Sequence, residues 1–497
     1  MGAVIGEGKS LSELGLTARG GREARVTGLS VDSREVSSGH LFAALPGTKV
    51  HGAAFIPTAL EQGASAILTD AEGAALAAEA LAGSEAALVI AADARQTLAY
   101  AAALWFGAQP EVTVAVTGTN GKTSVATFLR HIWQDMGFRA INLGTTGVEG
   151  DWQAPLKHTT PEPITLHRAL AGAAEAGVDH CAMEASSHGL DQRRLDGVQL
   201  KAAGFTNFTQ DHLDYHADFE EYFAAKAGLF ARVLPDEGVA VINIDDPRGI
   251  DMMAIARARG QEVISVGEAT GCDLRILGQR FHATGQDLRL DWRGAVQQLR
   301  LGLIGGFQGQ NAALAAGLAL ACGAEPEQVF PALERLETVR GRMQLAATRD
   351  NGAAVYVDFA HTPDAVATAL QALRPHVMGR LIAIVGAGGD RDPGKRPLMG
   401  AAATEHADMV IVSDDNPRSE EPGSIRAQVL GGAPGALEVG DRAEAILRGV
   451  DMLQPGDALM ILGKGHETGQ IVGDTIYPFD DVEQASVAVA ALDGRGL

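Results

Sequence analysis

The stretch Val112-Thr113-Val114-Ala115-Val116-Thr117-Gly118-Thr119-Asn120-Gly121-Lys122-Thr123 decides the fold of the middle of this chain. Its apolar, β-branched first half predicts a strand, its glycines predict a tight turn, and residues 124–133 are compatible with a helix. That order aims backbone N–H groups and the positive end of a helix dipole at one point, as a phosphate group requires. Lys122 would then reach the outer phosphates of a nucleotide, and the Thr123 hydroxyl would help to hold Mg²⁺.

The motif differs from the usual GxxxxGK[ST] pattern, because Val116 stands at the position of the first glycine and Gly118 lies closer to the lysine. The alternative is an ordinary strand, turn and helix that carries a chance Gly-Lys pair. The strand before the glycines and the helix after them argue against chance, since that context is what confirms the motif. The sequence therefore predicts a site for a nucleoside triphosphate.

The length and composition indicate a multidomain globular protein. A chain of 497 residues is too long for one core, and a prior of about 150 residues per domain suggests three domains. The residues are 46% hydrophobic and 21% charged, as in ordinary soluble proteins. The 62 acidic and 40 basic residues give a net charge of −22, which argues against a general binder of nucleic acid or of anionic membranes.

The cysteines and the apolar stretches favour a cytoplasmic location. Cys181, Cys272 and Cys322 are far apart and odd in number, so they predict neither a disulfide framework nor a zinc site. The first residues have no basic segment followed by an apolar run, so we expect no secretory signal. Apolar stretches such as residues 312–324 are too short to span a bilayer.

Strands alternate with helices along the chain, which predicts an α/β fold in three domains. We place these domains at residues 1–92, 93–338 and 339–497. The first is a smaller α/β unit, the second carries the phosphate loop on a mostly parallel sheet, and the third is a Rossmann-like α/β unit. Strands are predicted over residues 41–45, 66–69, 87–90, 112–117, 180–183, 202–206, 239–243, 355–357, 381–385, 409–412 and 458–462. Helices are predicted over residues 55–62, 96–106, 124–133 and 311–321, with a further helix near Val339.

Polar side chains follow two predicted strands of the middle domain. Glu184 comes directly after the strand 180–183, and His212 lies in the segment after the strand 202–206. Ligands of open α/β sheets bind at the carboxyl ends of the strands. A carboxylate and an imidazole beside a phosphate loop would make a magnesium site, although imidazole is an unusual ligand for Mg²⁺. From spacing alone, a surface acid and a satisfied loop histidine remain equally good interpretations.

Charged side chains follow three predicted strands of the last domain. The strand 381–385 leads to Arg391, the strand 409–412 to Arg418, and the strand 458–462 to Glu467. If these strands are neighbours, guanidinium and carboxylate groups face one pocket. Arginine suits a carboxylate and glutamate suits an ammonium group, so the pocket would fit a zwitterion. The alternative is ordinary salt bridging around solvated loops.

Several motifs occur in a fixed order along essentially the whole chain. They are Gly118-Thr119-Asn120-Gly121-Lys122-Thr123, Glu184-Ala185-Ser186-Ser187-His188-Gly189-Leu190, Tyr222-Phe223-Ala224-Ala225-Lys226-Ala227-Gly228-Leu229-Phe230, Gly341-Arg342-Met343, Val357-Asp358-Phe359-Ala360-His361-Thr362-Pro363, Asp415-Asn416-Pro417-Arg418 and Gly463-Lys464-Gly465-His466-Glu467. Together they resemble the Mur ligase family, the ATP-dependent amino-acid ligases of peptidoglycan precursor synthesis. Departures are Phe307-Gln308-Gly309, where the family has Phe-Asn-Val, and the loop of residues 48–50.

The resemblance implies roles that spacing cannot show. It implies catalytic roles for Lys122, Lys226, Glu184 and His212. Metal ligands would be Thr123, Glu184, His212 and a carbamylated Lys226. ATP would contact Gly118, Thr119, Asn120, Gly121, Lys122, Thr123, Ser124, Asn311, Arg342 and Asp358. A UDP-sugar peptide would contact Ser33, Thr159, Thr160, Ser187, Gln192 and Arg194. Diaminopimelate would contact Arg391, Asp415, Asn416, Pro417, Arg418, Gly463 and Glu467.

The reaction implied by the resemblance is a two-step ligation with ATP and Mg²⁺ as cofactors. The D-Glu γ-carboxylate of UDP-N-acetylmuramoyl-L-Ala-D-Glu would become an acyl phosphate, which the amine of meso-diaminopimelate then attacks. The enzyme would act as a monomer on these small molecules, with no nucleic acid or membrane partner. Alternatives are the same ligation with L-lysine, a folylpolyglutamate-type ligase, or a scaffold protein that only hydrolyses ATP slowly.

Overall fold

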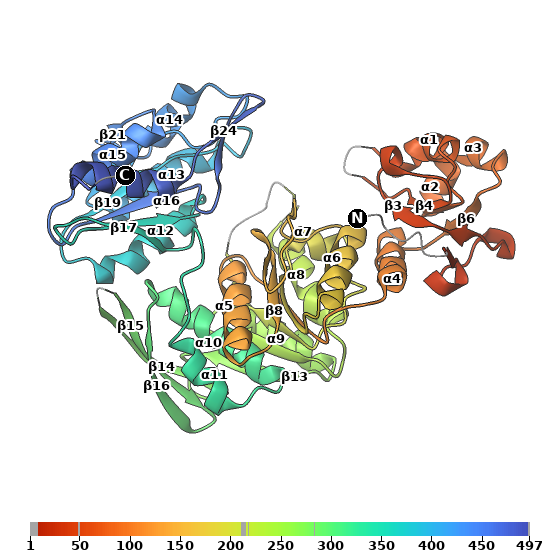
Figure 1. The fold of residues 1–497 in the computed structure, drawn as a ribbon, viewed down its shortest axis with the longest axis horizontal. Coiled ribbons are helices and arrows are strands. Elements are labelled where there is room, and N and C mark those ends of the chain that lie inside the picture. The colour runs from red at the N-terminus through yellow and green to blue at the C-terminus, as the bar shows by residue number, and fades with distance from the viewer. Residues whose placement is uncertain (1–7, 48–49, 210–214, 217, 283, 496–497) are drawn as a thin grey trace.

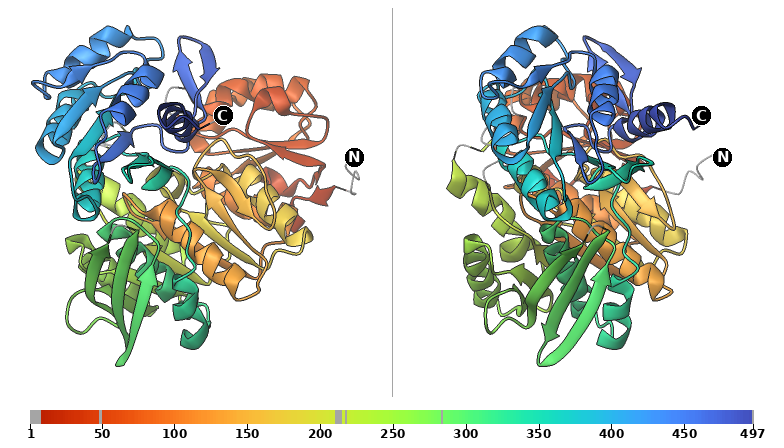
Figure 2. Two further views of the ribbon diagram at one scale, coloured as in Figure 1. Left: turned by 60° about the vertical axis from the view of Figure 1, so that its left-hand side comes forward. Right: turned by 90° about the vertical axis from the view of Figure 1, so that its left-hand side faces the viewer.

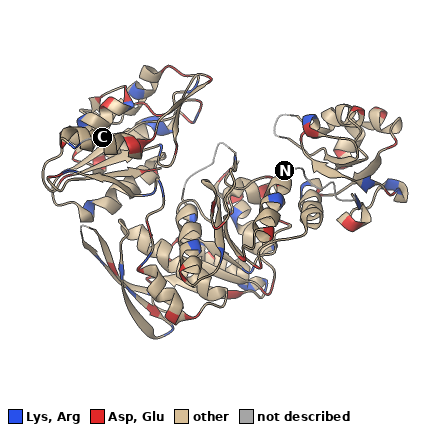
Figure 3. Cartoon of the chain, viewed as in Figure 1, with Lys and Arg blue, Asp and Glu red and all other residues tan. Residues whose placement is uncertain are grey.

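The computed structural model describes residues 8–47, 50–209, 215–216, 218–282 and 284–495. The chain forms three successive α/β parts, each built on its own main sheet (Figure 1). In both views of Figure 2 the N-terminal and C-terminal parts lie above the central one. Lysine and arginine residues are scattered among acidic residues over all three parts (Figure 3). Across the described ranges, no helix has both the length and the apolarity of a membrane span.

The N-terminal part is a four-stranded parallel sheet of order β3-β4-β5-β6. Its strands are β3 (Gly28–Ser30), β4 (His40–Ala43), β5 (Ala66–Thr69) and β6 (Ala87–Ile90). The helices α1 (Ile56–Glu61), α2 (Ala71–Leu76) and α3 (Ala78–Ala82) belong to it, and β1 (Lys9–Ser10) pairs with β2 (Arg25–Val26) beside it. Helix α4 (Ala94–Phe106) buries Leu98 and Ala102 in the same apolar core.

The central sheet has ten strands in the order β16-β15-β14-β13-β12-β11-β7-β10-β8-β9. The strands are β7 (Val112–Thr117), β8 (Ala140–Gly144), β9 (Gly147–Gly150), β10 (His180–Glu184), β11 (Ala202–Phe205), β12 (Val239–Asn243), β13 (Glu262–Gly267), β14 (Leu274–His282), β15 (Gly285–Trp292) and β16 (Ala295–Leu301). The strands from β8 to β13 through β7 run parallel and are largely apolar, as expected for a sheet covered on both faces, and β14 starts parallel to β13 over two residue pairs.

Helices cover both faces of this sheet. One face packs α5 (Lys122–Asp135), α10 (Gly306–Ala321) and α11 (Pro326–Leu333), whose apolar side chains share one core. The other face packs α6 (Pro163–Glu175), α8 (Phe219–Gly228) and α9 (Pro247–Ala258). The short helix α7 (Ser187–Asp191) follows β10 directly. The predicted mostly parallel central sheet is thus confirmed.

The structure corrects one predicted helix and adds strands that the sequence analysis did not identify. Helix α11 ends at Leu333, so the helix expected near Val339 is wrong. Leu333, Leu336 and Val339 are buried in the same core at intervals of three residues, and this spacing imitates a helix in a segment that is irregular beyond α11. Strands β14, β15 and β16 form an antiparallel extension of the sheet.

The C-terminal part is a six-stranded sheet of order β17-β18-β22-β19-β20-β21. Its strands are β17 (Gln344–Thr348), β18 (Ala354–Asp358), β19 (Leu381–Val385), β20 (Met409–Val412), β21 (Leu437–Glu438) and β22 (Ala458–Leu462), with a separate hairpin of β23 (Gly469–Val472) and β24 (Thr475–Pro478). Helices α12 (Pro363–Leu373), α13 (Lys395–His406) and α14 (Pro422–Leu430) pack on one face, and α15 (Arg442–Asp451) and α16 (Asp481–Leu492) on the other. The α/β prediction in three parts is confirmed, while the boundaries after residues 92 and 338 stay predictions.

A buried ion pair joins α15 to α16, and its loss should destabilise the C-terminal part. The Arg442 guanidinium donates to Asp481 through Nε and Nη2, both at 2.7 Å, and neither side chain is exposed. Asp481→Ala would leave a buried cation unpaired, so we expect thermal or urea unfolding to show a loss of about 3–5 kcal/mol. Glu444→Ala removes an exposed pair with Arg448 on the same helix and should change stability by less than about 0.5 kcal/mol. Equal effects of the two variants would contradict this expectation.

A buried histidine on α6 should make the fold sensitive to acid. Burial lowers the pKa of His167 from 6.5 to about 4. Between pH 6.5 and pH 4 the His167 imidazole binds a proton in the unfolded chain but not in the folded chain. The contribution of neutral His167 to the free energy of unfolding is therefore complete above pH 6.5 and is lost as the pH falls towards 4. The free energy of unfolding, measured with urea at pH about 7 and about 4.5, should fall between these pH values by up to about 3 kcal/mol less in His167→Phe than in wild type. The control is His406→Phe on α13, and equal acid sensitivity of wild type and His167→Phe would refute the assignment.

Candidate active site

The phosphate loop connects β7 to α5 and is packed so closely that glycine is required at two positions. Gly118 has φ +142°, and a Cβ there would lie 1.9 Å from the Thr206 hydroxyl oxygen. Gly121 has φ +86° at the start of α5, and a Cβ there would lie 2.6 Å from Asn311 Oδ1. Both conformations are ones that other residues adopt with strain. The loop therefore brings bare backbone against its neighbours, as an anion cradle does.

Two lysines converge on the carbonyl oxygen of Gly118. Lys122 Nζ donates to it at 2.9 Å and also to the carbonyl of Thr119 at 2.8 Å. Lys226 Nζ, from α8, donates to the same Gly118 oxygen at 2.8 Å. Lys226 is only 1% exposed, and its ammonium lies 4.4 Å from the centre of the Tyr222 ring. Amphipathic spacing alone suggests a surface position for Lys226, but the structure buries it beside the phosphate loop.

Glu184 ends β10 and is held by groups from the first turn of α5 and from the turn after β8. Its Oε1 accepts hydrogen bonds from Thr123 Oγ1 at 3.0 Å and from the Thr145 backbone N–H at 2.8 Å. The Thr145 hydroxyl lies 3.3 Å from Oε2, and the carboxylate is buried. A Cβ at Gly144 would lie 2.0 Å from Oε1, so the carboxylate also rests on bare backbone. A hydroxyl and a carboxylate at this spacing are oxygen donors of the kind that Mg²⁺ prefers.

The remaining predicted metal ligand, His212, lies outside the described residues. Within the described ranges, no group of three or more His, Cys, Asp and Glu side chains is close enough to share a metal ion. The described metal candidates are therefore Thr123, Glu184 and Lys226.

The loop after β11 is hydrogen-bonded to the phosphate loop. The Asn120 backbone N–H donates to Asn207 Oδ1 at 2.9 Å, and the Thr209 backbone N–H donates to the Thr119 hydroxyl at 3.0 Å. Ser124, also predicted to contact ATP, is buried in the first turn of α5. These bonds fix the backbone of the loop at the carboxyl end of the sheet.

The other residues predicted to contact ATP fall into two groups. Asn311 lies on α10 against Gly121, and its Nδ2 donates to Gln308 Oε1 at 3.0 Å. Asp358 ends β18 in the C-terminal part and accepts hydrogen bonds from two backbone N–H groups, at 2.7 and 2.9 Å. Burial raises the pKa of the Asp358 carboxyl, and the nearby Arg342 guanidinium opposes that rise. Arg342 stacks 4.7 Å from the centre of the Phe359 ring.

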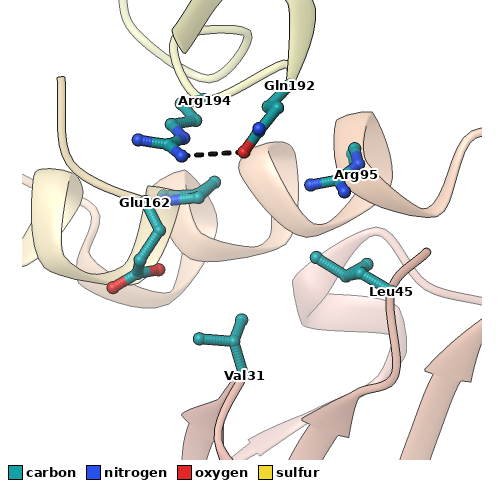
Figure 4. Close-up of a pocket in the computed structure, with 7 residues that line it drawn as sticks. Val31, Leu45, Arg95, Glu162, Gln192 and Arg194 are labelled. Atoms are coloured by element: carbon teal, nitrogen blue, oxygen red, sulfur yellow. Dashed lines mark hydrogen bonds between the residues drawn. The ribbon is translucent and has the colours of Figure 1, made fainter. Parts of the chain in front are cut away.

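A cavity of about 190 Å³ opens between the N-terminal and central parts (Figure 4). Two residues predicted to bind the UDP-sugar peptide line it, and Arg194 Nη2 donates to Gln192 Oε1 at 2.7 Å. Its other lining residues are Val31, Leu45, Arg95, Glu162 and Pro163. The sequence analysis missed these five. Two of them, Arg95 and Glu162, look like ordinary surface charges near helix starts.

Threonines connect this cavity to Glu184. Arg194 Nη1 donates to the Thr160 carbonyl at 2.6 Å, and the Thr160 hydroxyl donates to the Glu184 carbonyl at 2.9 Å. The Thr159 hydroxyl lies 3.0 Å from that of Thr145, which contacts the Glu184 carboxylate.

Two further predicted contacts are the buried serines Ser187, at the start of α7, and Ser33, two residues beyond Val31 of the cavity lining.

The strand ends of the C-terminal part lie next to one another, because β22, β19 and β20 are neighbours in the sheet. Asn416 Nδ2 donates to Glu467 Oε2 at 2.8 Å, which joins the loops after β20 and β22. Asp415 and Pro417 are buried, and a Cβ at Gly463 would lie 2.4 Å from Asp415 Oδ2. These predicted contacts therefore form one cluster.

The two arginines of this region differ in their surroundings. Arg418 has φ +51°, an unusual backbone conformation for a side chain of its size, and its Nη1 donates to the Gly389 carbonyl at 2.8 Å. It therefore bridges the loops after β20 and β19. Arg391 is exposed, and its Nη1 lies 3.3 Å from the carbonyl of Asp390. Only Arg418 is thus fixed against its neighbours.

The chain matches known protein families over most of its length. Residues 25–105 match the "Mur ligase family, catalytic domain", residues 116–319 the "Mur ligase middle domain", and residues 341–465 the "Mur ligase, glutamate ligase domain".

Relatives of known name span nearly the whole chain. The UDP-N-acetylmuramoyl-L-alanyl-D-glutamate–2,6-diaminopimelate ligase of Caulobacter vibrioides is 50% identical and is matched over 94% of this chain and 96% of its own length. The ligase of that name from Bradyrhizobium diazoefficiens is 47% identical over 94% of this chain and 95% of its own length. A solved structure of a ligase of that name superposes with a TM-score of 0.72 at 33% identity, over 98% of this chain and 99% of that one. The chain therefore belongs to the Mur ligase family.

Proposed function

We propose that this protein is an ATP-dependent ligase that joins meso-diaminopimelate to the D-Glu γ-carboxylate of UDP-N-acetylmuramoyl-L-Ala-D-Glu, releasing ADP and phosphate. The observation that carries the proposal is the connection through Glu184. Its side chain contacts Thr123 of the phosphate loop, and its backbone carbonyl contacts Thr160, which joins the cavity of Gln192 and Arg194. A phosphoryl donor and a carboxylate acceptor would thus meet at one strand end. Relatives at 46–50% identity are named UDP-N-acetylmuramoyl-L-alanyl-D-glutamate–2,6-diaminopimelate ligase, which supports the choice of substrates.

In the activation step, the γ-carboxylate of the acceptor attacks the γ-phosphorus of ATP, and ADP leaves. The triphosphate lies at the N-terminus of α5, where Gly121 and the first turn of the helix supply backbone N–H groups, and Lys122 turns from its loop carbonyls to the outer phosphates. Asn311, Arg342 and Asp358 complete the proposed nucleotide contacts. The product is an acyl phosphate, whose carbonyl carbon is open to attack by an amine.

The residues near the loop fit Mg²⁺, because Thr123 and Glu184 present a hydroxyl and a carboxylate 3.0 Å apart. When bound there, the ion would neutralise charge on the phosphates. His212 and a carbamylated Lys226 would add further ligands. Carbamylation adds the neutral amine of Lys226 to CO₂ with loss of a proton, and it replaces an ammonium with an anionic oxygen donor. The burial of Lys226 beside Gly118 supports this assignment.

The capture step uses the C-terminal part. The carboxylate of Glu467 binds an ammonium group of the amino acid, while Arg391 and Arg418 bind carboxylate. Asp415, Asn416, Pro417 and Gly463 shape the pocket between them. The free amine attacks the acyl phosphate, an amide forms, and phosphate leaves. Approach of this part to the central part would shield the acyl phosphate from water.

Arg418 favours diaminopimelate over L-lysine. Lysine lacks the distal carboxylate, so its binding would leave the guanidinium without an anionic partner, which is unfavourable in a half-buried site. A folylpolyglutamate-type ligase, which adds glutamate, is the other alternative. We further propose that the enzyme acts as a cytoplasmic monomer, with the three domains ending near residues 92, 338 and 497.

An amino-acid panel tests the function. Purified protein is given ATP, Mg²⁺ and the UDP-muramoyl dipeptide with meso-diaminopimelate, L-lysine or L-glutamate, and phosphate release and the peptide product are measured. We expect release to require both acceptor and meso-diaminopimelate. Arg418→Ala should lower kcat/KM for diaminopimelate by roughly 100-fold and leave any activity with lysine unchanged. Release without the acceptor, or a preference for lysine or glutamate, would contradict the proposal.

Lys226 provides a separate test of the metal and carbamate assignment. Lys226→Ala should lower kcat by roughly two to three orders of magnitude, because the anionic group near the phosphates is lost. Short carboxylates such as acetate should partly restore turnover by replacing the carbamate. The control is Lys201→Ala, an exposed lysine of the same part of the chain, tested with the same additive. Full activity of Lys226→Ala without additive would exclude the assigned role.

A further inference from the structure

Lys464 is a fully buried lysine whose role is not explained by the contacts proposed above. It lies just after β22 and its side chain is 0% exposed. Its Nζ donates to Asn416 Oδ1 at 3.1 Å, to Glu467 Oε2 at 3.3 Å and to the carbonyl of Gly469. Burial of an ammonium group is unfavourable unless such partners compensate for lost hydration. The position of Lys464 therefore depends on these three contacts and holds them together.

Lys464 is one of three groups that fix which way the Asn416 side chain faces. Lys464 Nζ and the Ile471 backbone N–H, at 3.1 and 2.9 Å, can only donate, so the Asn416 atom that they contact must be the oxygen. A glutamate carboxylate only accepts, so the atom 2.8 Å from Glu467 Oε2 must be the amide nitrogen. The amide cannot rotate by 180° without losing all three bonds. Asn416 is thus a fixed donor towards Glu467.

The same contacts orient the Glu467 carboxylate. Oε2 is occupied by Asn416 Nδ2 and Lys464 Nζ. The Glu467 side chain is 35% exposed, so the carboxylate is held at one oxygen by buried donors while part of it remains open to solvent. An ammonium group that enters the pocket would therefore meet an acceptor whose rotamer is already set. Fixing an acceptor before binding reduces the entropy lost on binding.

The hairpin of β23 and β24 is attached to the pocket by Lys464 and by further hydrogen bonds. Besides the bond from Lys464 to Gly469, the Gln470 side chain donates to the Asp415 carbonyl at 2.7 Å. The Arg418 backbone N–H donates to the Ile471 carbonyl at 3.0 Å. Lys464 thus stands where the strand-end loops and the hairpin meet, and its ammonium group is the buried charge among the several hydrogen bonds that join them.

We propose that Lys464 is a positioning residue for the amino-acid substrate, acting through Asn416 and Glu467 without touching the substrate itself. This rests on the function proposed above. Lys464 fixes the glutamate oxygen that receives the substrate ammonium and keeps the hairpin against the pocket. Its loss should weaken capture of the amino acid and leave activation of the acceptor intact, because the hydrogen bonds of its ammonium group go to Asn416, Glu467 and Gly469 and not to the residues proposed to contact ATP.

The test compares Lys464→Met with wild type in two assays. In the first, acyl phosphate formed from ATP and the UDP-muramoyl dipeptide, without amino acid, is trapped as a hydroxamate by hydroxylamine. In the second, KM and kcat for meso-diaminopimelate are measured. We expect Lys464→Met to keep hydroxamate formation within about twofold of wild type and to raise the KM for diaminopimelate by roughly tenfold or more. Lys201→Met, at an exposed site, should alter neither assay.

A double-mutant cycle shows whether Lys464 acts through Glu467. Adding Lys464→Met to Glu467→Gln should change the KM for diaminopimelate much less than Lys464→Met does alone, since the shared partner is already altered. Where Lys464→Met does not give folded protein, Lys464→Gln replaces it in the same cycle.

Different results would overturn the positioning role of Lys464 and the proposed function. An unchanged KM, an equal loss of hydroxamate formation, or additive effects in the cycle would overturn the positioning role. A wild-type enzyme that forms neither hydroxamate nor tripeptide would instead overturn the proposed function.

Discussion

The Glu184 carboxylate is the group on which the arrangement of the central site depends. A buried carboxylate is tolerated only when donors compensate for its lost hydration. Here the donors come from α5 through Thr123 and from the turn between β8 and β9 through Thr145. Satisfying one charge therefore holds three chain segments at the carboxyl edge of the sheet. Because the Glu184 backbone carbonyl also binds Thr160, the neighbouring cavity inherits the same alignment.

The C-terminal pocket is supported by buried cations in a comparable way. Arg442 pairs with Asp481 and also donates to the carbonyls of Leu462, which ends β22, and of Asp414, two residues after β20. Lys464 also joins these two loops, through Asn416. The residues proposed to contact the amino acid therefore rest on a charged framework that water does not reach. Rigid support of this kind is what precise binding of a small zwitterion requires.

Features set by local sequence could be predicted, and features set by distant packing could not. The segment 112–123 specifies its own strand, turn and helix, and the apolar strands of the last part mark their own polar ends. Lys226 was different, because helix spacing does not show which face meets a loop more than a hundred residues away. The hairpin of β23 and β24 carries weak alternation and depends on its partners. Strand β15, in contrast, alternates polar and apolar residues from Asp287 to Trp292, which is a strand signal that the sequence analysis did not use. Arg95 joined a cavity only because the N-terminal part folds against the central one.

Helix α10 contacts both the phosphate loop of the central part and the core of the C-terminal part. Asn311 on this helix lies against Gly121 of the phosphate loop. Phe307, in its first turn, packs with the core of the C-terminal part, and the Gly305 backbone N–H just before it donates to His376 Nε2 at 3.1 Å. Since an α-helix bends little over so short a length, these contacts hold the loop and the C-terminal part at a set spacing. Any approach of the two parts must therefore either move with α10 or break the contacts at its first turn.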